Sequence, residues 1–538
     1  MSHTLSSLFD LNHAPVLVVG AGIMGAGIAQ VAALAGHPVM LFDVREGAAD
    51  QSRTQLAATL ETLAAKGKLT AEAAAQALER ITAISALESA AHAHLVVEAI
   101  VEKLEAKRSL FRQLEGIVSA DCVLATNTSS ISVTAIANGL HHPQRLVGMH
   151  FFNPVPLMKL VEVVSGLQTA PAVAEAIFRL SKVWGKVAVH ARSTPGFIVN
   201  RIARPYYAET LALLQEQAAT PPELDACLRA VGFRMGPCEL MDLIGHDTNF
   251  SVTQSVYEAN FYDKRFVPSL VQRELVDGGL LGRKTGRGFY TYPLTQPAAH
   301  AATDTSAPDV PAHTSVCVVG SGPVAQRLAQ ALTAAGVAFA VASGGDEAPP
   351  QGAAPAYGVG PQGGRAWVGL LVNGTQQLRL TDGRTATALG AEAGNDVAVF
   401  DLPMPVPGSA TASGAAVLAH AVSLRASDDW AAAAAQWLRV LGFAPLRMAD
   451  APGLVVARTL AMLINEAADA VQQGVCSPEG ADAAMKLGVN YPAGPFEWLA
   501  RWDVRAVVAL LDALDAHCRG ERYRVSPWLR QQAALLAA

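Results

Sequence analysis

The sequence is poor in charged residues. Only 16% of its 538 residues are Asp, Glu, Lys or Arg, whereas 51% are hydrophobic, and the formal net charge is −6. A protein that binds nucleic-acid phosphates needs clustered lysines and arginines, so we expect no nucleic-acid partner. The many apolar residues in a chain of this length instead predict several domains, each with its own packed core.

The chain also lacks a C-x-x-C pair, and its cysteines are scattered along the sequence. Such spacing in a long chain is typical of reduced, buried thiols rather than of a disulfide framework. We therefore expect a cytoplasmic protein and no metal site. The six cysteines are Cys122, Cys227, Cys238, Cys317, Cys476 and Cys518.

Residues 14–42 contain no Asp, Glu, Lys or Arg, a property that they share with membrane spans and signal peptides. The residues before this stretch have no Lys or Arg, which a secretory signal requires. The glycines near its start and Asp43 directly after it fit a buried strand, turn, helix and strand better. We expect no membrane segment.

From residue 14 to about 192, short β-rich runs alternate with stretches of helical periodicity. This alternation predicts an α/β Rossmann-type doubly wound sheet, largely parallel and covered by helices, over residues 1–192. The expected strands are 15–20, 38–43, 81–85, 94–100, 123–129, 145–152, 160–164 and 186–191.

The strand signal then stops, and residues 193–292 have the pattern of an all-α helical domain. Pro205 is expected to kink the first helix, because proline removes a backbone donor. Residues 293–312 are rich in Pro, Ala and Ser, which is typical of a linker.

The second half of the chain repeats the first in weakened form. Residues 313–448 begin with another strand and glycine turn, and residues 449–538 resemble the first helical domain. We therefore predict a degenerate Rossmann-like domain followed by a second helical domain. The matching residues, each 257 positions apart, are Pro195 and Pro452, Gly196 and Gly453, Arg201 and Arg458, Glu209 and Glu466, and Asp225 and Asp482.

A dinucleotide site is predicted at the first glycine turn. Gly20, Gly22 and Gly25 permit a tight turn and a close backbone approach at a helix N-terminus, which offers free N–H groups to a pyrophosphate. Asp43 follows Gly25 by 18 residues, where a carboxylate binds ribose hydroxyls and repels a 2′-phosphate. The motif therefore favours NAD over NADP.

The corresponding turn of the second half is poorer. It keeps Gly320 and Gly322 but has Ala325 at the third position, and no acid follows its second strand. We expect this copy to bind no nucleotide.

The segment "GMHFFNPVPLMKLVEVV" places His150 and Glu162 among apolar residues. Burying either group unpaired is costly, so the two are expected to pair across neighbouring strands. A carboxylate behind an imidazole fixes its tautomer and makes it a better general base. Each residue alone would fit a structural role in the core. Together, beside the nucleotide turn and the "NTSS" loop at 127–130, they indicate catalysis.

Six motifs together resemble the L-3-hydroxyacyl-CoA dehydrogenases: "GAGIMGAGIAQ", "VVEAIVE", "ATNTSS", "GMHFFNPVPLMKLVEVV", "STPGFIVNR" and "GRKTGRGFYTY". The match covers about the first 290 residues and recurs, degraded, in the second half. The tandem layout is similar to that of bacterial members that act on 3-hydroxybutyryl-CoA or, in phenylacetate degradation, on 3-hydroxyadipyl-CoA. The resemblance implies NAD-dependent oxidation of an L-3-hydroxyacyl-CoA to a 3-ketoacyl-CoA.

The resemblance also implies roles for particular residues. His150 would be the base and Glu162 its partner, while Ser129 and Asn200 would bind the substrate near its 3-oxygen. The cofactor residues would be Gly20, Gly22, Met24, Gly25, Asp43, Glu102, Lys107, Asn153 and, with weaker support, Lys284. Lys66 and Lys68 would meet the CoA phosphates, although a solvated helix end explains them equally well.

The second copy has no "NTSS" or "HFFNP" segment, no equivalent of Glu162, and Ala457 in place of Asn200. We expect its helical domain to pair with residues 196–290 as a built-in partner, and the chain as a whole to be a monomer or a homo-oligomer. Two other functions stay open: a related dehydrogenase of a small hydroxy acid or sugar acid, and a non-catalytic cofactor-binding protein. The acyl chain length is also open. Arg201, Arg204 and Arg234 could receive a terminal carboxylate, or they could serve only at the surface or at helix ends.

Overall fold

The computed structural model describes residues 11–293, 314–342, 367–393, 396–404 and 415–536. The chain forms two compact units. Unit 1 comprises Met1–Ile202 and Ala470–Asn490, and unit 2 comprises Ala203–Asp469 and Tyr491–Ala538. The predicted linker lies, apart from Pro293, outside the described residues.

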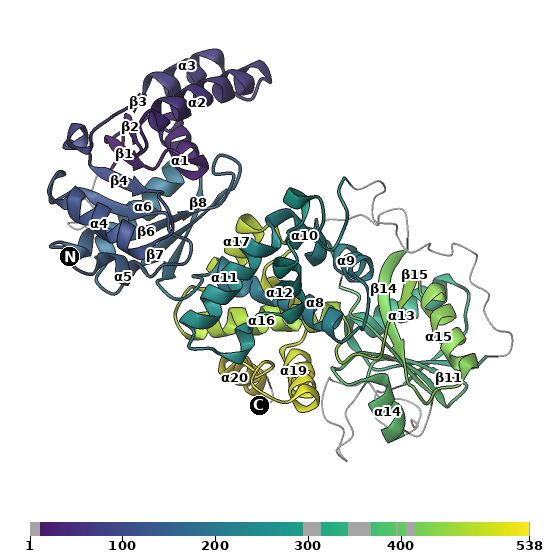
Figure 1. Ribbon diagram of the computed structural model, residues 1–538. Coiled ribbons are helices and arrows are strands. Elements are labelled where there is room, and N and C mark those ends of the chain that lie inside the picture. The colour runs from purple at the N-terminus through teal and green to yellow at the C-terminus, as the bar shows by residue number, and fades with distance from the viewer. Residues whose placement is uncertain (1–10, 294–313, 343–366, 394–395, 405–414, 537–538) are drawn as a thin grey trace. The chain divides into compact units, whose positions relative to one another are not determined.

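Unit 1 is built on an eight-stranded sheet in the order β3-β2-β1-β4-β5-β6-β7-β8, labelled in part in Figure 1. Only β6 and β7 pair in antiparallel fashion. All eight predicted strands are present, so the Rossmann-type prediction is confirmed. The strands are β1 (Val16–Val19), β2 (Val39–Phe42), β3 (Ile81–Ala83), β4 (Leu95–Glu98), β5 (Val123–Thr126), β6 (Leu146–Phe151), β7 (Leu160–Ser165) and β8 (Val187–Arg192).

Helices cover this sheet because its strands are apolar on both faces and bury nearly every side chain. Two of the helices, α2 and α3, form a hairpin at the edge of the unit (Figure 1). The helices are α1 (Ile23–Leu34), α2 (Ala48–Ala65), α3 (Ala71–Glu79), α4 (Leu104–Glu115), α5 (Val133–Ala137), α6 (Pro171–Val183) and α7 (Val199–Ile202).

One helix of unit 1 comes from the second half of the chain. Helix α17 (Pro478–Gly488) packs against β7, β8 and α7. A Cβ added at Gly488 would lie 2.7 Å from Leu160 and 3.0 Å from Val199, so the helix approaches this surface closely. The repeat pattern gave no sign that the second helical domain would supply a helix to the first sheet.

Unit 2 contains a seven-stranded sheet in the order β10-β9-β11-β12-β13-β14-β15. It differs from the first sheet at β11, which is antiparallel to both β9 and β12. The β11–β12 hairpin thus replaces a parallel crossover. The prediction of a degenerate Rossmann-like domain in the second half is confirmed. The strands are β9 (Val316–Val319), β10 (Ala340–Ala342), β11 (Gly369–Val372), β12 (Gln376–Leu380), β13 (Val397–Phe400), β14 (Ala416–Val422) and β15 (Phe443–Arg447).

Pro205 lies at a break between two helices rather than at a kink within one helix. Helix α7 ends at Ile202, and α8 begins at Arg204 with Pro205 in its first turn. Proline is tolerated there because the backbone N–H groups of the first turn have no partner within the helix. The helices of unit 2 are α8 (Arg204–Gln215), α9 (Pro221–Ala230), α10 (Pro237–Ile244), α11 (His246–Ala259), α12 (Leu270–Asp277), α13 (Gly322–Ala334), α14 (Ala386–Ala393), α15 (Asp428–Val440), most of α16 (Val456–Gln472), α18 (Pro495–Arg501), α19 (Val504–Cys518) and α20 (Pro527–Leu535).

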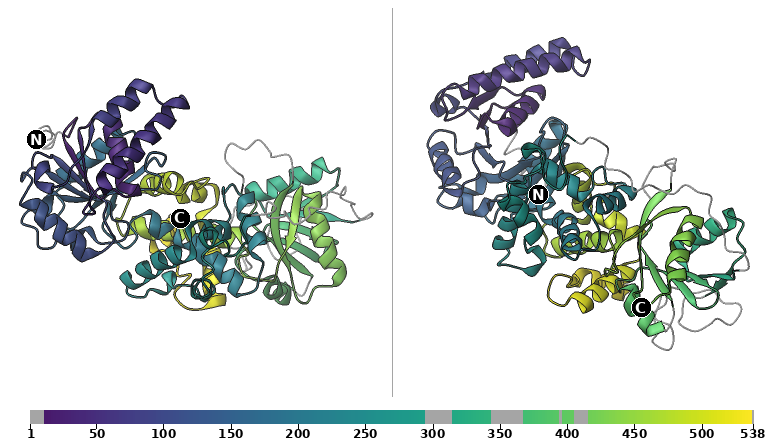
Figure 2. Two further views of the ribbon diagram at one scale, coloured as in Figure 1. Left: turned by 45° about the horizontal axis from the view of Figure 1, so that its top comes forward. Right: turned by 45° about the vertical axis from the view of Figure 1, so that its right-hand side comes forward.

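The helices of the two copies pack against each other within unit 2, and Figure 2 shows the yellow helices of the second copy beside the teal ones of the first. Arg265 of the first copy pairs with Glu466 of the second at 3.2 Å. The equivalent residues in reverse, Arg522 and Glu209, pair at 2.9 Å. Such reciprocal pairing is the mark of a two-fold related interface, here within one chain.

No helix among the described residues is long and apolar enough to cross a membrane. The six cysteines are free thiols.

Candidate active site

His150 and Glu162 are paired directly across β6 and β7, as the sequence predicts. The His150 Nδ1 atom lies 2.5 Å from the Glu162 Oε2 atom, and both side chains are buried. The other carboxylate oxygen accepts the backbone N–H groups of Ile198 at 3.1 Å and Val199 at 2.9 Å. One carboxylate therefore holds the imidazole and caps α7.

This arrangement decides which ring nitrogen is free to react. An ionised carboxylate only accepts hydrogen bonds, so Nδ1 of His150 must carry the proton. The Nε2 atom then presents a lone pair, which is what a general base needs. The ring is flanked by Phe152 and Phe197, with ring centroids 4.5 and 5.9 Å away.

The "NTSS" loop is organised by Glu102. Its Oε1 atom accepts the Thr128 hydroxyl at 2.6 Å and the backbone N–H groups of Ser129 at 2.9 Å and Ser130 at 3.1 Å. Burial alone would raise the pKa of Glu102, but the charge of Lys107 and these donors hold it below its ordinary value. Glu102 thus fixes the backbone of the loop that carries Ser129.

Lys107 sits beneath this loop between two carboxylates. It is buried and lies 2.6 Å from Glu98 and 3.2 Å from Glu102. Glu98 is also buried and accepts the Thr126 hydroxyl at 2.7 Å. Glu98 was not among the residues predicted from the sequence, although a carboxylate that ends a buried apolar strand needs a partner.

Two amide side chains connect the segments that carry Ser129 and His150. Asn200 donates through Nδ2 to the Ser129 carbonyl at 3.3 Å, and the Asn127 side chain accepts the Phe151 N–H at 2.8 Å. The structure therefore brings Ser129 and Asn200 into contact, next to the strand that holds His150. Asn127, within the "NTSS" motif, received no role from sequence.

The first glycine turn fits a dinucleotide. Gly20 has φ +105°, and a Cβ there would lie 2.4 Å from the Ala99 carbonyl oxygen. A Cβ at Gly25 would lie 1.7 Å from the Gly20 oxygen, so helix α1 requires glycine there to approach the turn. Gly22 faces open space, as a backbone that contacts a pyrophosphate must. Met24 packs against the core beside them.

Asp43 follows β2 and is anchored to the same turn. Its Oδ2 atom accepts the Ala21 N–H at 2.8 Å, and Arg45 contacts both of its oxygens. The Arg45 hydrogen bond lowers the pKa of Asp43 to about 2, so this carboxylate is charged at neutral pH. It is therefore a strong acceptor for ribose hydroxyls.

A pocket of about 210 Å³ lies between α1, α2 and the turn at 153–156. It is lined by Ile23, Gln30, Gln55, Thr59 and Asn153, among others. Lys186 holds this turn in place by donating to the Val155 and Met158 carbonyls, and its burial lowers its pKa to about 8. Sequence reasoning missed Lys186. Lys66 and Lys68 are exposed between α2 and α3.

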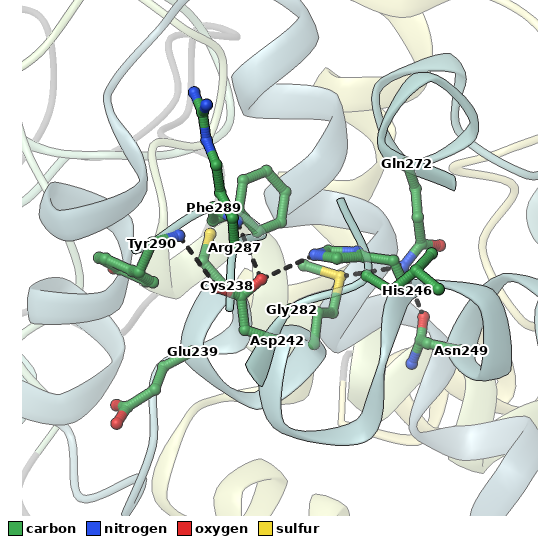
Figure 3. Close-up of polar contacts among 12 residues, drawn as sticks. Cys238, Glu239, Asp242, His246, Asn249, Gln272, Gly282, Arg287, Phe289 and Tyr290 are labelled. Atoms are coloured by element: carbon green, nitrogen blue, oxygen red, sulfur yellow. Dashed lines mark hydrogen bonds and ion pairs between the residues drawn. The ribbon is translucent and has the colours of Figure 1, made fainter. Parts of the chain in front are cut away.

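The "GRKTGRGFYTY" segment lies in unit 2, where its main contacts are structural (Figure 3). Buried Asp242 accepts the N–H groups of Phe289 and Tyr290, both at 2.9 Å, and pairs with His246. Lys284 forms an ion pair with Asp247. Its predicted cofactor role stays a prediction.

The second copy also has a carboxylate that accepts the N–H groups at the start of a helix, but this carboxylate follows β13, whereas Glu162 is on β7, the counterpart of β14. Asp401 directly follows β13, and its N–H donates to the carbonyl of Ala419, which lies 257 positions after Glu162. Asp401 therefore stands where His150 stands in the first copy. Its carboxylate accepts four backbone N–H groups, those of Leu402, Val455, Val456 and Ala457.

A Rossmann-type sheet with a dinucleotide turn, followed by helices and holding a buried His–Glu pair, defines a nicotinamide-dependent dehydrogenase. The model of the 3-hydroxyacyl-CoA dehydrogenase NAD-binding domain matches residues 15–194, and that of the C-terminal domain matches 196–292 and 453–535. A reduced Rossmann-fold domain of 3-hydroxybutyryl-CoA dehydrogenase matches 378–452. The chain belongs to the 3-hydroxyacyl-CoA dehydrogenase family.

The chain is 41% identical over 526 residues to 3-hydroxyadipyl-CoA dehydrogenase of Escherichia coli, with 98% of each chain covered. It is 40% identical to the mitochondrial hydroxyacyl-coenzyme A dehydrogenase of Sus scrofa over 52% of this chain and 90% of that one. The crystal structure of an Escherichia coli 3-hydroxybutyryl-CoA dehydrogenase superposes with a TM-score of 0.82 at 40% identity, covering 98% of this chain and 99% of that one. The protein is an NAD-dependent oxidoreductase acting on 3-hydroxyacyl-CoA.

Proposed function

We propose that His150 is the base that removes the hydroxyl proton while the 3-hydroxyacyl-CoA is oxidised at C3. The contact that supports this role is the 2.5 Å pair between His150 Nδ1 and Glu162, which leaves Nε2 as the acceptor. Glu162 stabilises the imidazolium that forms. Ser129 and Asn200, in contact with each other, orient the 3-oxygen through their hydroxyl and amide groups.

NAD supplies the electron acceptor when bound, taking a hydride from C3. The residues that would hold it are Gly20, Gly22, Met24 and Gly25 at the pyrophosphate turn, with Asp43 on the adenosine ribose. Asn153, at the exposed turn, is proposed to reach the cofactor directly. Glu102 and Lys107 act mainly by fixing the loop beside it, because both are engaged with protein groups.

We infer that the CoA part lies along the pocket between α1, α2 and the 153–156 turn. Its Gln55 and Thr59 side chains suit the amides of a pantetheine arm. Lys66 and Lys68, exposed at the end of α2, suit the CoA phosphates.

The substrate that we propose is 3-hydroxyadipyl-CoA, an acyl-CoA whose chain ends in a second carboxylate. The relative with this printed activity matches essentially the whole tandem chain, not only its first half. The second candidate is 3-hydroxybutyryl-CoA, since a solved structure of that description also matches the whole chain.

A panel of 3-hydroxyadipyl-CoA, 3-hydroxyhexanoyl-CoA, 3-hydroxybutyryl-CoA and free 3-hydroxyadipate, followed by NADH absorbance, tests this assignment. We expect the highest kcat/KM with 3-hydroxyadipyl-CoA and no turnover of the free acid. A preference for the four-carbon substrate would replace the assignment.

We also propose that the second helical segment is a built-in partner for the first, as the reciprocal Arg265–Glu466 and Arg522–Glu209 pairs suggest. The second glycine turn is proposed to bind no nucleotide, since Ala325 replaces its third glycine. The free thiols support a cytoplasmic location.

A further inference from the structure

The carboxylate that follows β2 is filled by hydrogen-bond donors of the chain itself. An ionised carboxylate has about four positions that accept a hydrogen bond. Asp43 receives the backbone N–H groups of Ala21 at 2.8 Å and Arg45 at 3.0 Å, and the Nε and Nη2 groups of Arg45 at 3.0 and 3.1 Å. Ribose hydroxyls can therefore bind Asp43 only if some of these donors leave.

The guanidinium of Arg45 supplies the donors that can leave. The Arg45 side chain is 70% exposed, whereas the Asp43 side chain is only 8% exposed and is tied to the glycine turn by the Ala21 N–H. An ion pair at the surface is weak, because water solvates both partners. Two ribose hydroxyls can thus replace the two guanidinium donors while Asp43 itself stays in place.

The surroundings of Asp43 suit the adenosine part of a nucleotide. Strands β2, β1 and β4 are neighbours and run parallel, so the segments that follow them lie at one edge of the sheet. Each of these segments carries an exposed apolar side chain, namely Val44 at 89%, Ile23 at 78% and Val101 at 60% exposure. Apolar side chains gathered at one exposed edge are typical of a binding surface, here for a flat ring beside the ribose.

Arg45 also changes the charge that a nucleotide meets at this edge. A lone carboxylate repels a 2′-phosphate, which is why an acid at this position favours NAD. Arg45 places a positive charge on the same carboxylate, so the two side chains together carry no net charge. A guanidinium is moreover a good partner for phosphate oxygens, which its planar fork binds with charge-assisted hydrogen bonds.

We propose that Arg45 determines how strictly the site selects NAD over NADP. By neutralising Asp43, Arg45 lowers the discrimination against a 2′-phosphate below that of a lone carboxylate, and it binds this phosphate once Asp43 has lost its charge. The inference rests on the proposed contact of Asp43 with the adenosine ribose.

The test measures binding rather than turnover, in the full-length protein. NADH and NADPH differ only in the 2′-phosphate, and titrations followed by nicotinamide fluorescence give the Kd of each. Arg45→Gln leaves Asp43 as a lone charge. It is expected to weaken NADPH binding by about tenfold and to leave the Kd of NADH within about threefold. Both effects concern exposed charges, so they should shrink in about 1 M salt, where charges are screened beyond about 3 Å.

Asp43→Asn should have the opposite effect, because it frees the guanidinium for a phosphate. NADPH is expected to bind at least about tenfold more tightly than to the wild type. The double variant, Asp43→Asn with Arg45→Gln, should lose this gain. The matched control is Arg273→Gln, which removes an exposed arginine that is also paired with a carboxylate, Asp277, and should change neither Kd.

The outcomes separate this inference from the proposed role of Asp43. If Asp43→Asn tightens NADPH binding equally with and without Arg45, the guanidinium takes no part in the selection and the inference is wrong, although Asp43 keeps its role. If Arg45→Gln weakens both nucleotides equally, Arg45 serves binding but not selection, which also overturns the inference. If Asp43→Asn changes the affinity of neither nucleotide, the ribose does not meet Asp43, and both statements fail.

Discussion

In both copies of the repeat, a buried carboxylate lies at the N-terminus of the first helix after the sheet, which is α7 in the first copy and α16 in the second. The two carboxylates come from different strands. In the first copy, Glu162 on β7 reaches His150 with one oxygen and the N-terminus of α7 with the other. In the second, Asp401 after β13 occupies the position of the histidine and serves only the backbone N–H groups of 402 and 455–457.

The difference separates two tasks that Glu162 performs together. Capping a buried helix end requires only an acceptor near the orphan N–H groups, and either strand can supply it. The proposed role of His150 as a base requires the acceptor on the strand next to the imidazole. Once Ala419 replaces the glutamate, a histidine at position 401 would have no partner, and an aspartate satisfies the helix instead.

The largest effect should come from His150→Gln, which removes the proposed base. Turnover is expected to fall by about 10²–10⁴-fold, the usual span for general acid–base catalysis. NADH absorbance with saturating substrate measures it, and circular dichroism checks the fold. The control is His190→Gln on β8, whose imidazole is half exposed. A folded His150→Gln protein with more than a tenth of the wild-type turnover would show that another group is the base.

Glu162→Gln should have the next largest effect. A glutamine has one acceptor and one donor end, so it cannot accept both the His150 N–H and the α7 N–H groups. We expect kcat to fall by about 10- to 100-fold while KM changes little, because Glu162 positions His150 rather than touching the substrate. If KM rose instead with kcat unchanged, Glu162 would act in binding.

Much of this site is visible in the sequence because its residues stand out against their surroundings. His150 and Glu162 interrupt apolar strands, and the glycines of residues 20–25 have a fixed spacing. The strands follow from continuous apolar runs, and the break before α8 follows from Pro205. These features depend on neighbours in the sequence, so local patterns are enough to find them.

What the sequence does not reveal depends on contacts between distant segments. Helix α17 lies more than 300 positions from β7, and no local pattern indicates that it packs there. Asp401 follows a strand whose register with β14 must be known before its match to His150 appears. Lys186 has unremarkable neighbours in the sequence, and only the folded chain shows that it holds the 153–156 turn.

Gly488→Val tests whether the second copy supports the first site. The added side chain would meet Leu160 and Val199 and push α17 from β7 and α7. Overpacking of this kind costs about 1–3 kcal/mol of unfolding free energy. We expect kcat/KM to fall by less than about tenfold, since small displacements near a catalytic group slow the reaction. The matched control is Gly480→Ala on the same helix, where the nearest atom is 3.3 Å away. Equal effects of the two changes would show that the contact at Gly488 is unimportant.

Asp401→Asn should have the smallest effect on turnover, less than about twofold, because Asp401 lies in the copy that has no proposed base. The substitution should instead change the stability of the protein.

Burial raises the pKa of Asp401 from 3.8 to about 6, despite four backbone N–H groups that favour the charged form. A folded-state pKa above the unfolded value means that the stabilising contribution is present below about pH 4 and is lost as the pH rises through 6. The asparagine is always neutral, so the variant should gain stability relative to the wild type between pH 5 and 8, by at most about 3 kcal/mol. Urea unfolding at pH 5, 6, 7 and 8 measures this. If the stability of the wild type instead rose relative to that of the variant with increasing pH, the four N–H groups would be holding Asp401 as a carboxylate.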